Sequence, residues 1–239
     1  MFGVLEEMVR KKKIKPLLAI LSPRDIPWSE AKFHKIDYVD KVWFKYMNLF
    51  QALSAVEKYF REHEEYTHLI LNSDDGPPEY EYIAMLIADI KKYDFQSISG
   101  VCSVDSLRDD LFLSTTFNTV LTYVDTPIHR WLYQLLPNEF RELNGIIKIW
   151  FEGNALHTLR RDVVEKVGLT YSKRKGNSWH HNGDLALSYQ LSKAEITQYA
   201  DLRLYIKHYK YSKTSPPYNL LIGTKSPVII EEKATASIP

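Results

Sequence analysis

Two adjacent carboxylates, Asp74 and Asp75, follow a short apolar segment in the first third of the chain. Residues 67–71 read Thr-His-Leu-Ile-Leu, and they lead into Asn72-Ser73-Asp74-Asp75-Gly76-Pro77-Pro78. This order predicts a buried strand with a loop at its carboxyl end. Neighbouring carboxylates repel each other and resist desolvation, so a cation or hydrogen-bond donors must neutralise them. The turn therefore predicts a metal and phosphate site, although Asp-Gly and Pro-Pro are also ordinary turn residues.

The segments around this turn predict an alternation of strands and helices. Strands are expected at 16–21, 67–71, 97–102, 146–151 and 202–208, with a short extended piece near 35–39. Helices are expected at 42–64, from Pro77 to about Ile90, at 160–167 and at 184–191. Such alternation is typical of a parallel sheet covered by helices, in which ligands bind at the carboxyl ends of the strands. Residues 105–143 carry both extended and helical patterns and are not assigned.

The length and composition indicate one folded domain. With 239 residues, of which 45% are hydrophobic, the chain can bury a substantial core. We predict a single domain over residues 1–213. Residues 214–239 contain Pro216-Pro217 and end in small polar residues, so we expect a loosely structured extension there. The sequence contains no internal repeat.

Charge and cysteine content limit the partners and the compartment. The 31 Lys and Arg residues nearly balance the 30 Asp and Glu residues, which disfavours nucleic acid as the main partner. The single Cys102 cannot form an intramolecular disulfide, which suits a reducing compartment, and we expect the cytoplasm. No apolar run reaches the roughly 18 residues of a spanning helix. The basic residues 10–13 end a solvated helix or, alternatively, touch an anionic membrane surface.

Several common catalytic motifs are absent from the sequence. There is no Gly-x-Gly-x-x-Gly turn and no Gly-x-x-x-x-Gly-Lys loop, so the usual dinucleotide and P-loop sites are not expected. There is also no Gly-x-Ser-x-Gly elbow, and Cys102 falls in a predicted strand. Acid/base chemistry and metal chemistry remain.

Three separated features occur in a telling order. The first is the turn at 72–75, the second is the stretch 153–168, which begins Gly-Asn and contains Arg160-Arg161, and the third is His180-His181-Asn182-Gly183-Asp184 entering a predicted helix. Together they resemble the GT-A glycosyltransferases, the family-two-like enzymes that use nucleotide-sugars. The resemblance covers roughly residues 16–210. It implies an α/β, GT-A-like fold, that is, a Rossmann-like, mixed and mostly parallel sheet with helices on both faces.

The first feature resembles the Asp-x-Asp motif of that family, with Asn72 in place of the first acid. The resemblance implies that Asp74 is a ligand of Mn²⁺ or Mg²⁺, with Asp75 as a second candidate. Hard divalent ions take carboxylate and diphosphate oxygens together. Asn72 would face the ribose or the metal, and Ser73 would lie in the same nucleotide-sugar site. In some relatives a histidine after the last strand completes the metal site, which implies His208 here.

The other features imply the rest of the site. Gly153 and Asn154 would line the nucleotide-sugar site on its acceptor side. Asp184 would be the general base, although a carboxylate in a first helical turn is also an ordinary cap. His180 and His181 are weaker candidates. The nucleotide base and ribose would contact the loop after the first strand, which consists of Ser22, Pro23, Arg24 and Asp25. They would also contact an acid near the second strand, either Asp37 or Asp40.

The sequence therefore predicts a metal-dependent glycosyltransferase. It would move a sugar from a UDP- or GDP-sugar to a hydroxyl of a glycan, lipid or protein. Inversion is the preferred outcome because Asp184 supplies a base, and retention is the alternative. Two alternatives remain. One is nucleotidyl transfer, which uses the same strand and acid arrangement, and the other is a non-catalytic carbohydrate-binding or structural module.

Overall fold

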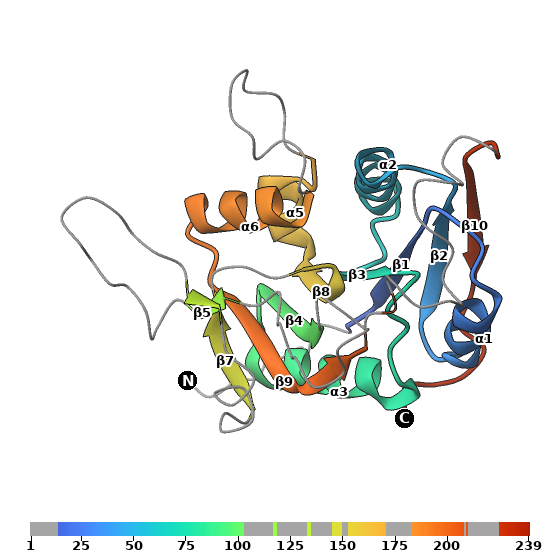
Figure 1. Ribbon diagram of the computed structural model, residues 1–239. Helices are drawn as coiled ribbons and strands as arrows, with labels where there is room; N and C mark the ends of the chain where they lie inside the picture. The colour runs from blue at the N-terminus through green and yellow to red at the C-terminus, as the bar shows by residue number, and fades with distance from the viewer. Residues whose placement is uncertain are drawn as a thin grey trace, which may run out of the picture.

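A mixed eight-stranded sheet forms the centre of the molecule (Figure 1). The computed structural model describes residues 14–102, 117–118, 133–134, 145–149, 153–170, 183–207, 209 and 225–239. Within them the strand order is β10-β2-β1-β3-β8-β4-β9-β7. The strands are β1 (Pro16–Ser22), β2 (Asp40–Lys45), β3 (His68–Ser73), β4 (Ser97–Cys102), β7 (Ile146–Ile149), β8 (Ala155–Arg160), β9 (Gln198–Ile206) and β10 (Val228–Glu232). A separate pair joins β5 (Phe117–Asn118) to β6 (Tyr133–Gln134).

The strands of the sheet run mostly in one direction. β1 pairs in parallel with β2 and with β3, and β4 pairs in parallel with β9. β8 lies antiparallel between β3 and β4, while β7 and β10 run antiparallel along β9 and β2. β2, β1, β3, β4 and β9 therefore share one direction. The predicted mixed, mostly parallel sheet is confirmed.

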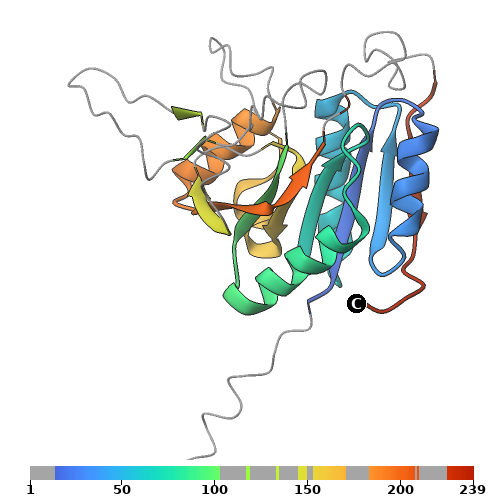
Figure 2. The same cartoon turned by 60° about the horizontal axis from the view of Figure 1, so that its bottom comes forward.

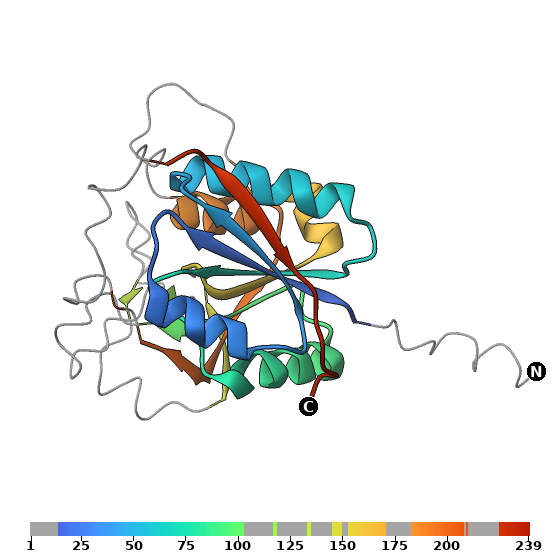
Figure 3. The same ribbon diagram turned by 90° about the vertical axis from the view of Figure 1, so that its right-hand side faces the viewer.

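Helices cover both faces of this sheet. On one face lie α1 (Pro27–Lys35) and α3 (Tyr80–Tyr93), and on the other lie α2 (Leu49–Glu62), α5 (Arg161–Val167) and α6 (Gly183–Lys193) (Figure 3). β1 is buried along its whole length. Its alternating side chains divide between two cores, because Leu17 and Leu21 pack on the α2 side and Leu18 and Ile20 pack on the α1 and α3 side.

The predicted helix at 42–64 is wrong at its beginning. Asp40–Lys45 forms β2, and α2 begins at Leu49. A capping box explains this start, since Asn48 accepts a hydrogen bond from the Gln51 amide and the Gln51 side chain accepts one from the Asn48 amide. α1 and β8 are absent from the sequence prediction. The predicted strands at 16–21, 67–71 and 97–102, and the helix after Pro78, are confirmed to within a few residues.

The C-terminal residues differ from the expected loose extension. Residues 228–232 form β10, which pairs antiparallel with β2 and extends the sheet. The run Val228-Ile229-Ile230 explains the difference, because β-branched residues favour a strand. The boundary predicted near residue 213, and the basic residues 10–13, lie outside the described residues. Among the described helices, none combines the length and the apolar character that crossing a bilayer requires.

Candidate functional site

The turn after β3 lies at a topological switch point of the sheet. The chain leaves β1 toward β2 and leaves the neighbouring β3 toward β4, so the two connections run in opposite directions (Figure 2). Ligands of open α/β sheets bind beside strands that diverge in this way. The Asp74 amide donates a hydrogen bond of 3.0 Å to the Leu21 carbonyl, which ties the turn to the end of β1.

The two carboxylates of the turn bind a buried arginine. The Arg24 guanidinium lies 2.6 Å from Asp75 Oδ2 and 3.3 Å from Asp74 Oδ1, both through Nη2. Asp74 and Arg24 are only 2% and 3% exposed. Ser22 Oγ donates to Asp74 Oδ2 over 3.5 Å, and the Ser29 hydroxyl of α1 donates to the Asp74 carbonyl. The turn, the β1 loop and α1 are thus joined through Asp74.

Burial and neighbouring charges shift the pKa values of Asp74 and Arg24. Burial, and then the neighbouring Asp75, raise the pKa of Asp74 to about 7, against the opposing effect of Arg24. Burial acts to lower the pKa of the Arg24 guanidinium, but Asp74 and Asp75 together raise it above its usual value. Arg24 therefore keeps its charge, while Asp74 is the member of the cluster that takes up a proton near neutrality.

Asn72 holds the turn from the inside. Its side chain is fully buried. Nδ2 donates to the carbonyls of Ser73 and Gly76 at 3.0 and 2.8 Å, and Oδ1 accepts a 3.0 Å hydrogen bond from the Leu156 amide. Leu156 has a φ of 55°, a conformation that a bulky residue rarely adopts. The expectation that Asn72 faces a ribose or a metal is therefore corrected, because its amide binds main chain on β3 and β8.

The structure brings Gly153 and Asn154 to the same edge. Ala155 at the start of β8 pairs with Asn72, so the two residues before it adjoin the turn that follows β3. Asn154 is partly buried, and within the described part of the chain its buried Oδ1 has no hydrogen-bond partner. The amide oxygen is thus available to a hydroxyl or amide donor.

An aromatic pair stands beside the turn, and sequence reasoning missed it. The rings of Trp28 and Tyr209 meet edge to face with centroids 4.6 Å apart. The Tyr209 amide donates a 2.7 Å hydrogen bond to the Asp75 carbonyl, which fixes this aromatic pair next to the acidic turn. High aromatic content was visible in the sequence, but aromatic residues also fill cores, so it could not indicate which rings lie here.

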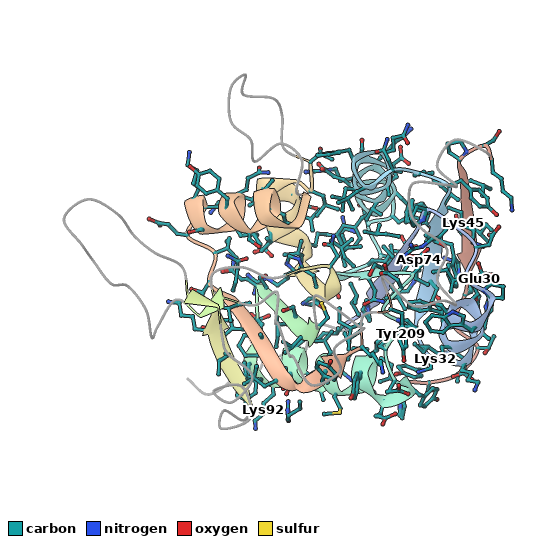
Figure 4. The ribbon with its side chains drawn as sticks, viewed as in Figure 1. Glu30, Lys32, Lys45, Asp74, Lys92 and Tyr209 are labelled. Atoms are coloured by element: carbon teal, nitrogen blue, oxygen red, sulfur yellow. The ribbon has the colours of Figure 1, made fainter. Side chains whose placement is uncertain are left out.

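A charged cluster lies at the adjoining end of β2. Lys45 Nζ lies 3.2 Å from Asp25 and 2.6 Å from Glu30, and Lys225 also bonds Asp25. Partial burial acts to raise the pKa of Asp25, but hydrogen bonds from Lys225, Tyr46 and Lys45 lower it to about 2. Figure 4 shows Asp74 in the right half of the view, with Lys45 and Glu30 to its right and Tyr209 below it. Lys45 was not predicted as a residue of this edge, because it fell in the wrongly predicted part of the helix at 42–64.

Asp40 and Asp37 do not belong to this edge. Asp40 begins β2, and β2 runs parallel to β1, so Asp40 lies at the opposite end of the sheet from Asp74. There it accepts hydrogen bonds from the Tyr66 hydroxyl and the Ala234 amide, both at 2.8 Å. Asp37 precedes it at that same end. The predicted role of either acid toward a ribose is wrong for this reason.

The remaining predicted residues are only partly described. Asp184 lies in the first turn of α6, as expected, and its side chain lies outside the described set. His180, His181 and His208 also fall outside the described residues. Pro23 lies in the β1 loop between Ser22 and Arg24.

The predicted Mn²⁺ or Mg²⁺ does not fit the side chains of this edge. Among the described residues, no group of three or more His, Cys, Asp or Glu side chains is placed to hold a metal ion. Asp74 and Asp75 both bind the Arg24 guanidinium instead. A divalent ion between them would lie against a fixed positive charge.

Comparisons with known proteins support the fold. No protein-family model and no curated protein matches the chain. Among solved structures, A197 from STIV is similar with a TM-score of 0.55 and 16% identity, over 82% of this chain and 85% of that one. CMP:2-keto-3-deoxy-manno-octonic acid synthetase complexed with CTP has a TM-score of 0.44 and 10% identity, over 81% of this chain and 90% of that one. At these identities the likeness to A197 shows an α/β fold of Rossmann-like type and nothing of the activity.

Proposed function

We propose that the chain is a glycosyltransferase that moves a sugar from a UDP- or GDP-sugar to a hydroxyl acceptor. The observation that carries the proposal is the position of the 72–75 turn at the switch point of the sheet, with the 22–25 loop on one side and Gly153-Asn154 on the other. Three segments that the sequence marked separately thus meet at one edge. Nucleotide ligands bind at this place in open α/β sheets.

The residues at this edge can hold the two parts of a nucleotide-sugar. The Trp28 and Tyr209 rings offer faces and edges on which a base or a sugar ring can stack. Asn154 Oδ1, which has no hydrogen-bond partner among the described residues, offers an acceptor for a sugar hydroxyl. Mn²⁺ or Mg²⁺ forms no part of the proposal, because Arg24 already bonds the carboxylates that would hold the ion.

Asp184 is the proposed general base. Its carboxylate would take the proton of the acceptor hydroxyl as the hydroxyl oxygen attacks the anomeric carbon from the face opposite the leaving nucleoside diphosphate. One bond to the sugar forms as the other breaks, so the configuration inverts. A glycan, a lipid or a protein can supply such a hydroxyl.

The proposal is tested by offering a panel of UDP- and GDP-sugars to the wild type and to Asp184→Asn. Turnover is measured by chromatography of the products. We expect release of nucleoside diphosphate and a fall in kcat of about 10²–10⁴-fold in the variant, with nucleotide affinity unchanged. Asp162→Asn is the matched control, because Asp162 also lies in the first turn of a helix but pairs with Arg160. Pyrophosphate release from a nucleoside triphosphate and a sugar would instead indicate nucleotidyl transfer. Absence of all nucleotide binding would leave a non-catalytic module.

A further inference from the structure

The acidic turn already binds a cation that comes from the loop after β1. One nitrogen of Arg24, Nη2, contacts Asp74 Oδ1 and Asp75 Oδ2, so a single positive charge bridges both carboxylates. All three side chains are buried. Buried charges persist only when they are paired and hydrogen-bonded. Arg24 therefore supplies the positive charge that two neighbouring carboxylates need and that a metal ion would otherwise supply.

The charges of this cluster disfavour the binding of a divalent ion. Two carboxylates carry at most two negative charges, and Arg24 offsets one of them. Adding a divalent ion would leave the buried cluster with a net positive charge, next to a guanidinium only 3.3 Å or less from each carboxylate. Moving Arg24 aside would in turn take a 3%-exposed guanidinium away from Asp74 and Asp75.

The main chain around the carboxylates is also fixed. The Asp74 amide bonds Leu21, the Asp74 carbonyl bonds Ser29, and the Asp75 carbonyl bonds the Tyr209 amide. Asn72 closes the turn from below through Gly76. The carboxylates thus meet Arg24 from a preset position, and a new coordination shell would require several of these bonds to break.

We propose that Arg24 is the resident cation of this edge and stands where a divalent metal would otherwise bind. Arg24 is a positioning residue that joins the β1 loop to the β3 turn. If the chain binds a nucleotide-sugar, as proposed above, the nucleotide binds at this edge without a metal ion.

The role of Arg24 is tested by measuring Mn²⁺ binding by calorimetry, in the absence of nucleotide. The proteins are the wild type, Asp74→Asn, Arg24→Met and Arg24→Met/Asp74→Asn. Methionine keeps much of the apolar stem of Arg24 and removes its charge. We expect no Mn²⁺ binding in the wild type that depends on Asp74. Arg24→Met should gain an Asp74-dependent Mn²⁺ site that binds at least about tenfold more tightly than any residual Mn²⁺ binding of the wild type, in the range of weak carboxylate sites, and the double variant should lose this site.

Mn²⁺ binding by the wild type that Asp74→Asn abolishes would overturn the inference, and so would a folded Arg24→Met that gains no site. Where Arg24→Met does not fold, the comparison of wild type with Asp74→Asn decides alone. A second titration, of UDP and GDP in EDTA and then in Mn²⁺, separates this inference from the proposed function. Affinities that agree within about twofold support a metal-free site, and binding only with Mn²⁺ contradicts it. If neither UDP nor GDP binds in either buffer, the proposed function is overturned. The role of Arg24 is then decided by the Mn²⁺ titrations alone.

Discussion

The burial of Asp74 links the stability of the fold to pH. The carboxyl has a pKa of about 7 in the folded protein and an ordinary value of 3.8 when unfolded. Between those values the folded state binds more protons than the unfolded state, so the free energy of unfolding falls as the pH rises. The contribution of a protonated Asp74 is fully present below about pH 4 and is lost as the pH passes 7.

Asp74→Asn should remove this slope. An amide cannot ionise, and Asp75 still pairs with Arg24 at 2.6 Å. We expect the wild type to lose about 2–4 kcal/mol relative to Asp74→Asn between pH 4.5 and 7.5, measured by urea unfolding at intervals of one pH unit.

Asp25→Asn is the matched control. The pKa of Asp25 is lowered to about 2, so its contribution is present above its ordinary pKa and is lost only as the pH falls toward 2. Asp25→Asn should therefore keep the wild-type slope between pH 4.5 and 7.5. Parallel profiles for the wild type and Asp74→Asn would show that Asp74 ionises normally in the folded protein.

The sequence predicted the acidic turn and the arginine loop but not their contact. Asp74 and Asp75 were singled out from local residue types, and Arg24 was implied only by the resemblance to the GT-A enzymes. Their pairing depends on the register of β1 against β3, which brings together residues about fifty positions apart. For the same reason Asp40 could not be excluded: whether an acid begins or ends a strand decides at which edge of the sheet it lies.

Arg161 joins two helices on one face of the sheet. The guanidinium donates to the carbonyls of Tyr66, Phe60 and His63 at 2.6 to 2.9 Å, and it lies 4.2 Å from the centre of the Phe60 ring. Two of these carbonyls lie at the end of α2, where the last carbonyls lack partners within the helix. A residue at the start of α5 thus caps α2.

Arg161→Ala should destabilise the protein by about 2–4 kcal/mol, because it leaves partly buried carbonyls without a charged donor. Urea unfolding gives the value. Arg160→Ala is the neighbouring control, since Arg160 pairs with the exposed carboxylates of Asp94 and Asp162, and it should cost under about 1 kcal/mol. Equal losses in the two variants would contradict a capping role for Arg161.

Local patterns predicted the helices better than the strands they join. The apolar face of α3 and the Gly168 after α5 were visible in the sequence. β8 was not, because its six residues mix His, Thr and Arg with leucines and show no clear alternation. The strand is specified by its neighbours, since β3 and β4 supply hydrogen bonds on both of its sides.

At the scale of the whole molecule, the strand order could not be read from the sequence. The alternation of strands and helices indicated a parallel sheet, but β8 enters between β3 and β4 from a distant part of the chain and runs the other way. β10 likewise adds to β2 from the far end of the sequence. Both pairings join segments that lie far apart in the sequence, so local residue patterns do not record them.

An ion pair between the buried Lys41 and the partly exposed Glu232 attaches β10 to the rest of the sheet. Lys41 is 1% exposed, and its Nζ donates to the carbonyls of Phe33 and Ile36 and lies 2.6 Å from Glu232 Oε1. Burial acts to raise the pKa of Glu232, but the hydrogen bond and charge of Lys41, with His34, lower it. Glu232 is therefore ionised at neutral pH and supplies the counter-charge of a lysine in the core.

Glu232→Gln should cost about 1–3 kcal/mol, because it keeps the shape of the side chain and leaves the Lys41 ammonium with carbonyl partners only. Glu231→Gln is the matched control, since Glu231 meets Lys233 at 4.0 Å with both side chains about half exposed, and it should change stability by less than about 0.5 kcal/mol. Because β10 covers the edge of β2, hydrogen exchange of the 41–45 amides should also rise in Glu232→Gln and stay unchanged in Glu231→Gln. Unchanged exchange in both variants would mean that the backbone ladder alone, without the ion pair, holds β10 on the sheet.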